Sequence, residues 1–342
     1  MGKPTVHDIA REAGVSLATV DRALNARPGV RKVTVQRVQD AVQKLGYIRD
    51  LSAANLARQR RYKFVFLLPD TPSLFLQSLC DAITEASAGM KADRSEIRTI
   101  QVSYQDPIAM MKVFSELELM DVDGVAVMGN ETPMMRDMIA RLKARGVAVV
   151  AWITDQPNSE RDHFVGIDNI AAGCTAGMLM GRFAGGRQGK IVVVVNTMQS
   201  RDMVERRIGF DEVIAEHFPN LETLPSVEGR DDHAQTAKVT ALSIAANDNI
   251  VGVYCVGAGM RGVTQVLEEQ GLGDKLVVVA HDLTAHSRAA LESGVVDVII
   301  NQNAGHLARS ASRILRAQCD GVDVIASQEK IRIEIVIREN LP

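Results

Sequence analysis

The 342 residues are enough for two or three domains, and a hydrophobic fraction of 46% is ample for globular cores. No apolar run reaches the about 18 residues of a membrane span, and the charged N-terminus lacks the apolar segment of a signal peptide, so we expect a cytoplasmic protein without a membrane partner. The net charge of −3 hides a division: residues 1–63 hold 13 Lys and Arg against 5 Asp and Glu, or +8, and the remainder holds 26 against 37, or −11. A basic segment joined to an acidic body favours contact with nucleic acid at one end only.

Residues 5–24 predict two short helices joined by a turn. Thr5 followed by Asp8 is typical of a capping box, Gly14 predicts a left-handed end to the first helix, and Ser16 predicts the cap of the second. The apolar residues expected to face inward are Val6, Ile9, Ala10, Ala13, Val20, Ala23 and Leu24. Two helices around a glycine turn indicate a helix-turn-helix unit, whose second helix enters a DNA major groove.

A third helix is predicted from Thr34, as its cap, to Leu45, with Gly46 ending it. The segments DIAREAGVS, TVDRALN, residues 30–38, LGY and NLA resemble the DNA-binding headpiece and hinge of the LacI/GalR family of transcriptional regulators. The rest of the chain resembles the effector-binding core of that family, which is related to type I periplasmic sugar-binding proteins. The resemblance covers essentially the whole chain.

The resemblance implies that Leu17, Ala18 and Arg22 read bases. Arg22 can pair bidentately with guanine, whereas Leu17 and Ala18 can only make apolar contacts, for example with thymine methyl groups. Asp21 stands where the family usually has Ser. Its carboxylate either accepts a hydrogen bond from a cytosine amine or forms an intramolecular pair with Arg22 or Arg31.

Other contacts are expected with the DNA backbone and the minor groove. Hydroxyls, amides and helix N-termini suit phosphate binding at Thr5, Ser16, Thr19, Asn25 and Thr34. Residues 51–59 resemble the hinge helix, with a minor-groove face at Ala53, Leu56 and Ala57. Leu56 is interpreted as a wedge that kinks DNA, the alternative being packing against the core. Arg49-Asp50 replaces the usual Pro-Asn, which leaves the rigidity of the hinge entry open.

From residue 64 onward, apolar strands alternate with helices, which indicates parallel sheets covered on both faces. Strands are expected at 64–68, 97–102, 123–128, 147–153, 164–167, 190–195, 221–227, 250–255, 276–280, 296–301 and 331–337. Helices are expected at 74–90, 107–120, 133–145, 170–184, 203–217, 232–246, 262–270, 285–293 and 303–318.

The expected fold class is α/β. A three-helix headpiece (1–48) and a hinge helix or linker (49–62) precede a core (63–342) of two doubly wound parallel-sheet lobes, as in periplasmic binding proteins of type I. The N-lobe is expected at about 63–165 and 302–320, and the C-lobe at about 166–301 and 321–342.

Ligands of doubly wound sheets lie beyond the carboxyl ends of the strands, so the cleft between the lobes is the expected effector site. Strand ends indicate candidates, and the family resemblance implies Arg206, Asp282 and Gln302 among them; the full set is Asp70, Phe75, Trp152, Asp155, Asp168, Arg206, Ala258, Asp282 and Gln302. Trp152 either stacks on a sugar or lies in the core, and Asp168 is either a helix cap or a ligand contact. The turn 257–259 replaces the Asn-Asp of many sugar-binding relatives, which favours close backbone approach to the ligand; it lacks the lysine and spacing of a P-loop.

Catalysis, a cofactor and a metal site find little support in the sequence. The four cysteines and the histidines show no metal-ligand spacing, and His281-Asp282 has no accompanying nucleophile. We therefore expect no enzyme, and the resemblance implies a ligand-responsive regulator that acts as a repressor, with a sugar or polyol as effector and a palindromic operator as partner. No heptad tail follows the last strand, which favours a homodimer over a tetramer. The alternatives are a solute-binding or sensor protein acting through a protein partner and, third, a carbohydrate-processing enzyme.

Overall fold

The computed structural model describes residues 4–24, 27–47, 60–90, 94–104 and 106–342. The chain forms two compact units, Met1–Arg60 and Arg61–Pro342. The hinge helix expected at residues 51–59 lies outside the described residues. In the part of the chain that is described, no helix is both long enough and apolar enough to span a bilayer.

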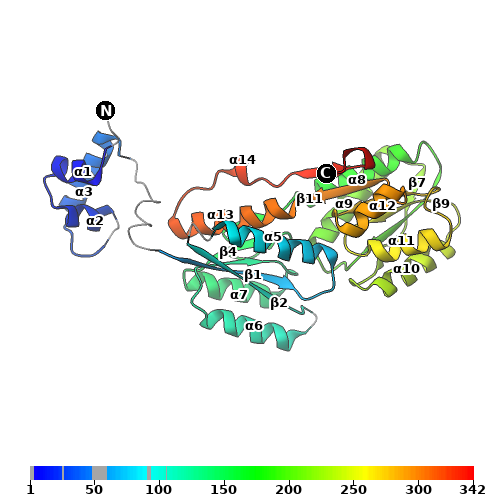
Figure 1. Ribbon diagram of the computed structural model, residues 1–342, viewed down its shortest axis with the longest axis horizontal. Helices are drawn as coiled ribbons and strands as arrows, with labels where there is room; N and C mark the ends of the chain where they lie inside the picture. The colour runs from blue at the N-terminus through cyan, green and yellow to red at the C-terminus, as the bar shows by residue number, and fades with distance from the viewer. Residues whose placement is uncertain (1–3, 25–26, 48–59, 91–93, 105) are drawn as a thin grey trace. The chain divides into compact units, whose positions relative to one another are not determined.

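The first unit contains the three expected helices, α1 (Val6–Ala13), α2 (Leu17–Leu24) and α3 (Lys32–Leu45), which Figure 1 labels. Its small core consists of Ile9, Ala13, Val20, Val38 and Ala41. Gly14 (φ 62°) and Gly46 (φ 61°) end α1 and α3 in the left-handed conformation that glycine adopts without strain. The three-helix headpiece and its glycine turn are thus confirmed.

Two details of the headpiece differ from expectation. Helix α3 begins two residues before Thr34, because the Arg31 carbonyl already accepts hydrogen bonds from the N–H groups of Thr34 (2.9 Å) and Val35 (3.0 Å). Thr34 therefore lies in the first turn and is not the cap. Val6, expected to face inward, is 38% exposed. The Arg37 side chain reaches α1 and donates to the Gly14 carbonyl at 3.4 Å, which helps to satisfy the end of that helix.

The first lobe of the second unit is a parallel sheet of order β2-β1-β3-β4-β5. Its strands are β1 (Tyr62–Pro69), β2 (Ser95–Val102), β3 (Gly124–Val127), β4 (Ala148–Trp152) and β5 (His163–Val165). Helices α5 (Leu74–Met90) and α13 (Ala304–Asp320) cover one face, and α6 (Pro107–Leu119) and α7 (Pro133–Ala144) cover the other (Figure 1). Both faces of β1 are apolar, as expected of a central parallel strand.

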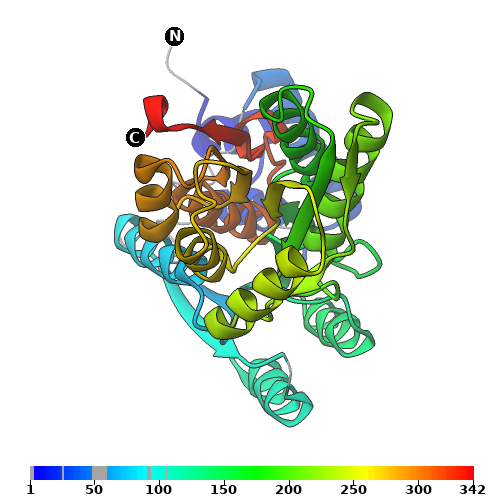
Figure 2. The ribbon, with the colours of Figure 1, turned by 90° about the vertical axis from the view of Figure 1, so that its right-hand side faces the viewer.

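The second lobe is a sheet of order β12-β11-β10-β9-β6-β7, in which only β12 runs antiparallel. Its strands are β6 (Gly189–Val195), β7 (Leu221–Thr223), β8 (Val227–Glu228), β9 (Ile250–Cys255), β10 (Val277–His281), β11 (Val298–Gln302) and β12 (Ile333–Val336). Its helices are α8 (Asn169–Phe183), α9 (Arg201–His217), α10 (His233–Ala245), α11 (Met260–Glu269) and α12 (Ala285–Ser293). The red C-terminal segment in Figures 1 and 2 contains β12, which pairs with the orange strand β11.

The chain passes between the two lobes three times. Residues 166–168 lead from β5 to α8, Asn303 alone separates β11 from α13, and residues 321–332 lead back from α13 to β12 through the short helix α14 (Ala326–Glu329). The two sheets are therefore not consecutive stretches of sequence.

The strand predicted at 221–227 is wrong as a single element. It is split into β7 and β8, which pair separately with β6. Pro225 lies between them, and proline has no N–H to donate to a ladder. Helix α11 begins at Met260 instead of Gly262, because Gly259 (φ 128°) already turns the chain into the helix.

Candidate functional site

The start of α2 presents an exposed surface in the headpiece. Leu17, Ala18, Asp21 and Arg22 are all exposed, whereas Val20 on the opposite side is fully buried. A recognition helix must present its N-terminal side chains in this way in order to reach base edges. The residues expected to read bases therefore lie together on one accessible face.

Asp21 lies opposite a partner that the sequence did not suggest. Arg27 Nη1 donates to Asp21 Oδ2 at 3.2 Å, so the expected intramolecular pair involves Arg27 in place of Arg22 or Arg31. Both side chains are half exposed, and such a pair contributes little to stability. Arg22 is exposed one position further along α2.

The hydroxyls expected at phosphates also organise the helix ends. The Asp8 carboxylate accepts from Thr5 N–H (2.9 Å) and Thr5 Oγ1 (2.7 Å), and Ser16 Oγ accepts from Thr19 N–H at 3.2 Å. Four further expected DNA contacts lie outside the described residues: Asn25, Ala53, Leu56 and Ala57.

In the second unit, a cavity of about 750 Å³ opens between the lobes at the carboxyl ends of the strands. This volume lies in the range of small-molecule sites. Its wall is rich in side chains that can bond to hydroxyl groups: Asp70, Thr71, Asn130, Thr154, Asn196, Asp202, Arg206, Glu228, Arg230, Asp231, Asp282 and Gln302.

Arg206 is the largest charged group that the fold buries, with 1% of its surface exposed. Its Nε donates to Asn169 Oδ1 at 2.9 Å, and its Nη1 donates to the Val256 carbonyl oxygen at 2.9 Å. Both partners belong to the second lobe, so the guanidinium is held in one orientation at the cavity. A buried guanidinium held in this way can present its remaining N–H groups to ligand oxygen atoms.

Close contact between α8 and α9 fixes the backbone of Arg206. A Cβ atom added to Gly173 would lie 2.0 Å from the Arg206 carbonyl oxygen, and one added to Gly209 would lie 2.2 Å from the Ile170 carbonyl oxygen. Only glycine permits such an approach of two helix backbones. The glycine-rich α8 therefore determines where Arg206 lies.

Asp282, directly after β10, and Gln302, the last residue of β11, form a buried pair. Gln302 Nε2 donates to Asp282 Oδ1 at 3.1 Å. Burial raises the pKa of the Asp282 carboxyl above its ordinary value, while Arg206 and the bond from Gln302 act in the opposite direction. Gln302 Oε1 is buried and has no hydrogen-bond partner among the described residues. A buried acceptor of this kind is satisfied when a ligand hydroxyl donates to it.

Backbone strain is concentrated at the cavity. Ile153 (φ 67°), Arg230 (φ 53°), Asp231 (φ 57°) and Asp282 (φ 67°) all have left-handed backbones and line the wall. Each such residue costs about 1–3 kcal/mol. Strain that gathers in three separate loops around one cavity is typical of a binding site.

Thr154 and Asp202 connect the lobes inside the cavity. Thr154 Oγ1, after β4 in the first lobe, donates to Asp202 Oδ1 of α9 at 3.2 Å. The same carboxylate oxygen accepts from Ser200 Oγ. Asp202 is 5% exposed and makes these bonds from inside the wall.

Six of the nine residues predicted for the effector site line this cavity: Asp70, Phe75, Arg206, Ala258, Asp282 and Gln302. The other three do not. Trp152 is fully buried, with Nε1 donating to the Leu307 carbonyl oxygen at 3.2 Å, so it is a core residue and not a stacking platform.

The two acidic candidates that lie elsewhere have local partners. The Asp155 carboxylate accepts from Arg161 Nε (2.5 Å) and Nη2 (2.9 Å), which uses the oxygens that were expected to bind vicinal hydroxyls. Asp168 Oδ1 accepts from Ala171 N–H at 2.9 Å as the cap of α8, the structural alternative of the two roles considered for it.

The sequence interpretation missed several wall residues. Asn196 directly follows β6, and Asn130 lies three residues beyond the end of β3. The signal that could have found them is a polar residue just after a buried strand. Asp231 had no such signal, because β8 is only two residues long.

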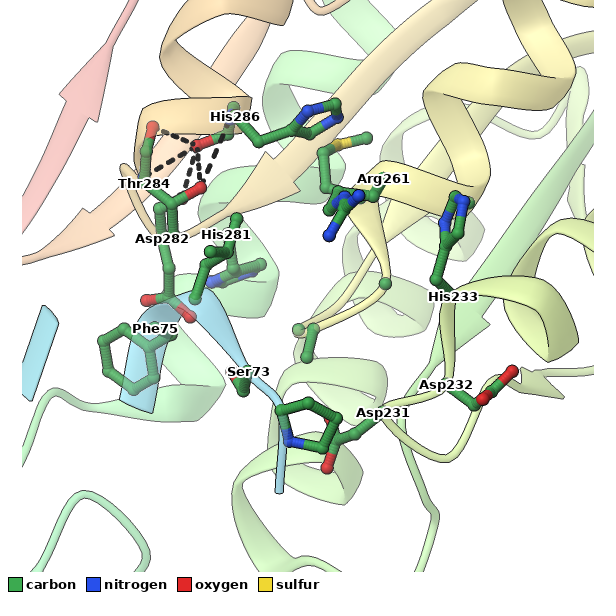
Figure 3. Close-up of a pocket in the computed structure, with 18 residues that line it drawn as sticks. Ser73, Phe75, Asp231, Asp232, His233, Arg261, His281, Asp282, Thr284 and His286 are labelled. Carbon is green, nitrogen blue, oxygen red and sulfur yellow. Dashed lines mark hydrogen bonds between the residues drawn. The ribbon is translucent and has the colours of Figure 1, made fainter. Parts of the chain in front are cut away.

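A smaller chamber of about 90 Å³ adjoins the cavity and is lined by residues 72–75 of the first lobe and by residues of the second lobe. Figure 3 shows Asp282 and Phe75 next to each other at one end of the chamber and Arg261 and His233 at the other. Phe75, Ala258 and Asp282 line both spaces. His281 also lines the chamber, and burial lowers its pKa, which keeps the ring neutral.

Two family models match the chain. The model described as a periplasmic binding protein domain matches residues 64–323, and the model described as bacterial regulatory proteins, lacI family, matches residues 5–50. Catabolite control protein A from Staphylococcus xylosus is 30% identical over 125 residues, which is 36% of this chain and 37% of that protein. The chain thus spans between a third and a half of the length of the curated relatives it matches.

Solved structures share the fold of the second unit. A solute-binding protein from Burkholderia graminis in complex with D-arabinose has a TM-score of 0.74 at 22% identity and covers 82% of this chain and 96% of its own. A solute-binding protein from Bacillus halodurans with bound myo-inositol has a TM-score of 0.72 at 20% identity, with the same coverage.

Proposed function

Because the chain belongs to the lacI family of bacterial regulatory proteins and carries a periplasmic binding protein domain, we propose that it is a transcriptional regulator that binds operator DNA under the control of a small solute. The headpiece supplies the DNA-reading face of α2. The cavity between the lobes receives the solute. The protein acts as a repressor in the cytoplasm, and a homodimer places two headpieces on a palindromic operator.

The observation that carries this proposal is the buried polar set around Arg206. A guanidinium held by two fixed acceptors and a Gln302 oxygen without a partner converge on one cavity with Asp282. These groups are preorganised for a ligand that both accepts and donates hydrogen bonds, as hydroxyl groups do. The strained loops around them indicate binding as well.

The effector is a neutral sugar or polyol. Aspartate and glutamate side chains outnumber arginines on the cavity wall, which disfavours a ligand that carries a negative charge. The solute-binding proteins with the same fold bind D-arabinose and myo-inositol, which are both uncharged polyhydroxy compounds. We infer that the cavity serves binding.

Operator binding is tested with the full-length protein and a library of inverted-repeat duplexes at several salt concentrations. The logarithm of the binding constant should fall with the logarithm of salt by about 0.9 for each phosphate contact. Absence of preference for any inverted repeat, with and without small solutes, would refute the regulator. A salt-independent interaction with a protein partner would instead favour a sensor.

Effector binding is tested by thermal shift over neutral sugars and polyols, because a true ligand raises the melting temperature by mass action. In Arg206→Lys the charge remains but the planar guanidinium is lost. The affinity derived from the thermal shift should therefore fall by about tenfold or more. Lys238→Arg, on the exposed side of α10, is the matched control and should leave the shift unchanged. An unchanged shift in Arg206→Lys would remove this residue from the site.

A further inference from the structure

The side chamber has no role in the function proposed above. It lies beside the main cavity and shares Phe75 and Ala258 with it, so one ligand can reach both spaces. Besides Phe75 and Ala258, the apolar residues that line it are Pro72, Leu74 and Met260. The chamber is therefore a candidate subsite for a part of the effector that the polar cavity does not hold.

The chamber exists because the turn after β9 carries almost no side chains. A Cβ atom at Gly257 would lie 2.7 Å from Met203 Cε, and Gly259 has a φ of 128°, which a residue with a side chain rarely adopts. Gly259 thus requires glycine, whereas a side chain at Gly257 would have to displace the end of Met203. Ala258 is the one side chain of this turn, and it lines both spaces.

The polar atoms on the far wall are already used. Thr284 Oγ1 and Ser287 Oγ share a hydrogen bond of 3.2 Å, and Ser287 Oγ donates to the Asp282 carbonyl oxygen at 2.8 Å. His286 Nε2 bonds to Thr264 Oγ1 at 2.8 Å. Figure 3 shows the Thr284 and Ser287 bonds as dashed lines. The Thr284, Ser287 and His286 side chains are therefore already bonded within the wall, whereas His281 Nδ1 in the chamber wall and Gln302 Oε1 in the main cavity are buried without a partner among the described residues.

A phosphate group is the main alternative occupant, because Gly257, Gly259 and Gly262 have the spacing of a dinucleotide-binding turn between β9 and α11. Contacts within the fold explain these glycines. A Cβ atom at Gly262 would lie 2.7 Å from the His233 carbonyl oxygen of α10, and the other two are constrained as described above. The carboxylates of Asp231 and Asp282 also line the chamber and would repel an anion.

We propose that the effector carries a small, uncharged apolar substituent that fills this chamber while its hydroxyl groups bind in the main cavity. A cavity of about 150 Å³ holds the six carbons of benzene. By that proportion, the 90 Å³ chamber holds about three or four carbon atoms. The proposal rests on the proposed function, since it describes the ligand of the same site.

Methionine methyl groups report on the two spaces separately. The chain has 14 methionines; Met260 lines only the chamber, whereas Met128 and Met203 line only the main cavity. Full-length protein labelled with ¹³C at the methionine methyls is titrated with 1-propanol and with glycerol. These probes share a three-carbon skeleton and differ in hydroxyl groups. We expect 1-propanol to shift the Met260 signal in a saturable way, and glycerol to shift only Met128 and Met203.

The conjugate 3-propoxy-1,2-propanediol tests whether one ligand spans both spaces. It should shift Met260 and Met203 together and bind about tenfold or more tightly than glycerol, because each buried methylene contributes about fourfold. Ala258→Leu fills the chamber and should abolish the Met260 response to 1-propanol. Ala289→Leu, an exposed position on α12, is the matched control and should preserve that response.

The proposal would be overturned by a Met260 signal that 1-propanol does not move, by a response that survives in Ala258→Leu, or by a conjugate that binds no more tightly than glycerol. A chamber that prefers ADP to 1-propanol would overturn it in favour of a phosphate site. Failure of the proposed function would look different, since no sugar or polyol would then shift Met128 or Met203.

Discussion

Asp282 has an unfavourable backbone conformation and a buried carboxyl group. The backbone has a φ of 67°, the side chain is 7% exposed, and burial raises the pKa of the carboxyl. Folding therefore favours the protonated form of this group. The carboxyl lies in the same cavity wall as Arg206 and Gln302, which can both be shared with a ligand.

Asp282→Asn should stabilise the ligand-free protein at neutral pH and weaken sugar or polyol binding. The wild-type group binds a proton more tightly when folded than when unfolded, so its contribution to stability falls as pH rises from the ordinary value of 3.8 through the higher folded pKa. The advantage of Asp282→Asn should therefore be smallest near pH 3.8 and should grow above it. Urea unfolding across this range measures it; an advantage that shrinks with rising pH would contradict the expectation.

Arg22 should determine base specificity in the headpiece. Arg22→Lys keeps the charge but loses the bidentate geometry, so discrimination at one base pair should fall by about 1–3 kcal/mol. Competition binding over single-base variants of the selected operator measures this loss. Arg11→Lys, on the exposed last turn of α1, is the control. It should weaken binding to all duplexes equally or not at all. If Arg22→Lys weakened binding to all duplexes equally, Arg22 would be assigned to phosphate contact.

Individual side chains could be assigned to the cleft only in part. Arg206, Asp282 and Gln302 were found through the family resemblance and the ends of predicted strands, and all three line the cavity. Asp155 satisfies the same strand-end rule but pairs with Arg161, which an isolated pattern cannot reveal. Trp152 is assigned to the core by its bond to a carbonyl of α13, which lies more than 150 residues away in sequence.

At the scale of elements, helices α8 and α9 act as one support for Arg206. Their backbones touch at Gly173 and Gly209, where any side chain would collide with a carbonyl group. The sequence predicted a helix at residues 170–184 but not its partner, because helix pairing depends on distances that periodicity does not contain.

Gly173→Ala should destabilise the protein by about 1–3 kcal/mol through overpacking, and it should weaken effector binding by displacing Arg206. Gly89→Ala is the matched control. Gly89 lies within α5 with no atom near an added Cβ, so alanine should stabilise that helix by about 0.5–1 kcal/mol. Chemical unfolding and calorimetric titration measure both effects. Unchanged affinity in a destabilised Gly173→Ala would separate the helix contact from the position of Arg206.

The alternation of strands and helices was predicted well, because buried parallel strands appear as apolar runs between amphipathic helices. The exceptions have local causes. Pro225 divides one strand, and a left-handed Gly259 begins α11 early. Helix α14 was not anticipated, since four residues carry too little periodicity to be recognised.

At the scale of the whole molecule, the lobes of the second unit are also joined by an ion pair. Arg201 of α9 lies 3.4 Å from Glu131, in the loop before α7, and Asn158 Nδ2 donates to the same carboxylate at 2.6 Å. Glu131 is mostly buried, whereas Arg201 is 39% exposed, so solvent screening reduces the strength of this pair.

Glu131→Gln should weaken effector binding by about threefold, because the neutral side chain holds the lobes together less firmly. Glu118→Gln is the matched control, since Glu118 pairs with Arg141 within the first lobe at 3.2 Å and should not affect affinity. Calorimetric titration at low and high salt measures the difference, which should shrink at high salt. Equal effects of the two substitutions would show that the pair does not couple the lobes.

The single-residue crossing at Asn303 has a consequence for how this architecture can vary. Gln302 ends β11 inside the cavity, and the next residue already caps α13, with Asn303 Oδ1 accepting from His306 N–H at 2.9 Å. An insertion here would displace either the glutamine or the cap, so the length of this connection is constrained by ligand recognition. The third crossing, residues 321–332, supplies no side chain to the cavity wall. A change in its length would therefore displace no residue that lines the cavity.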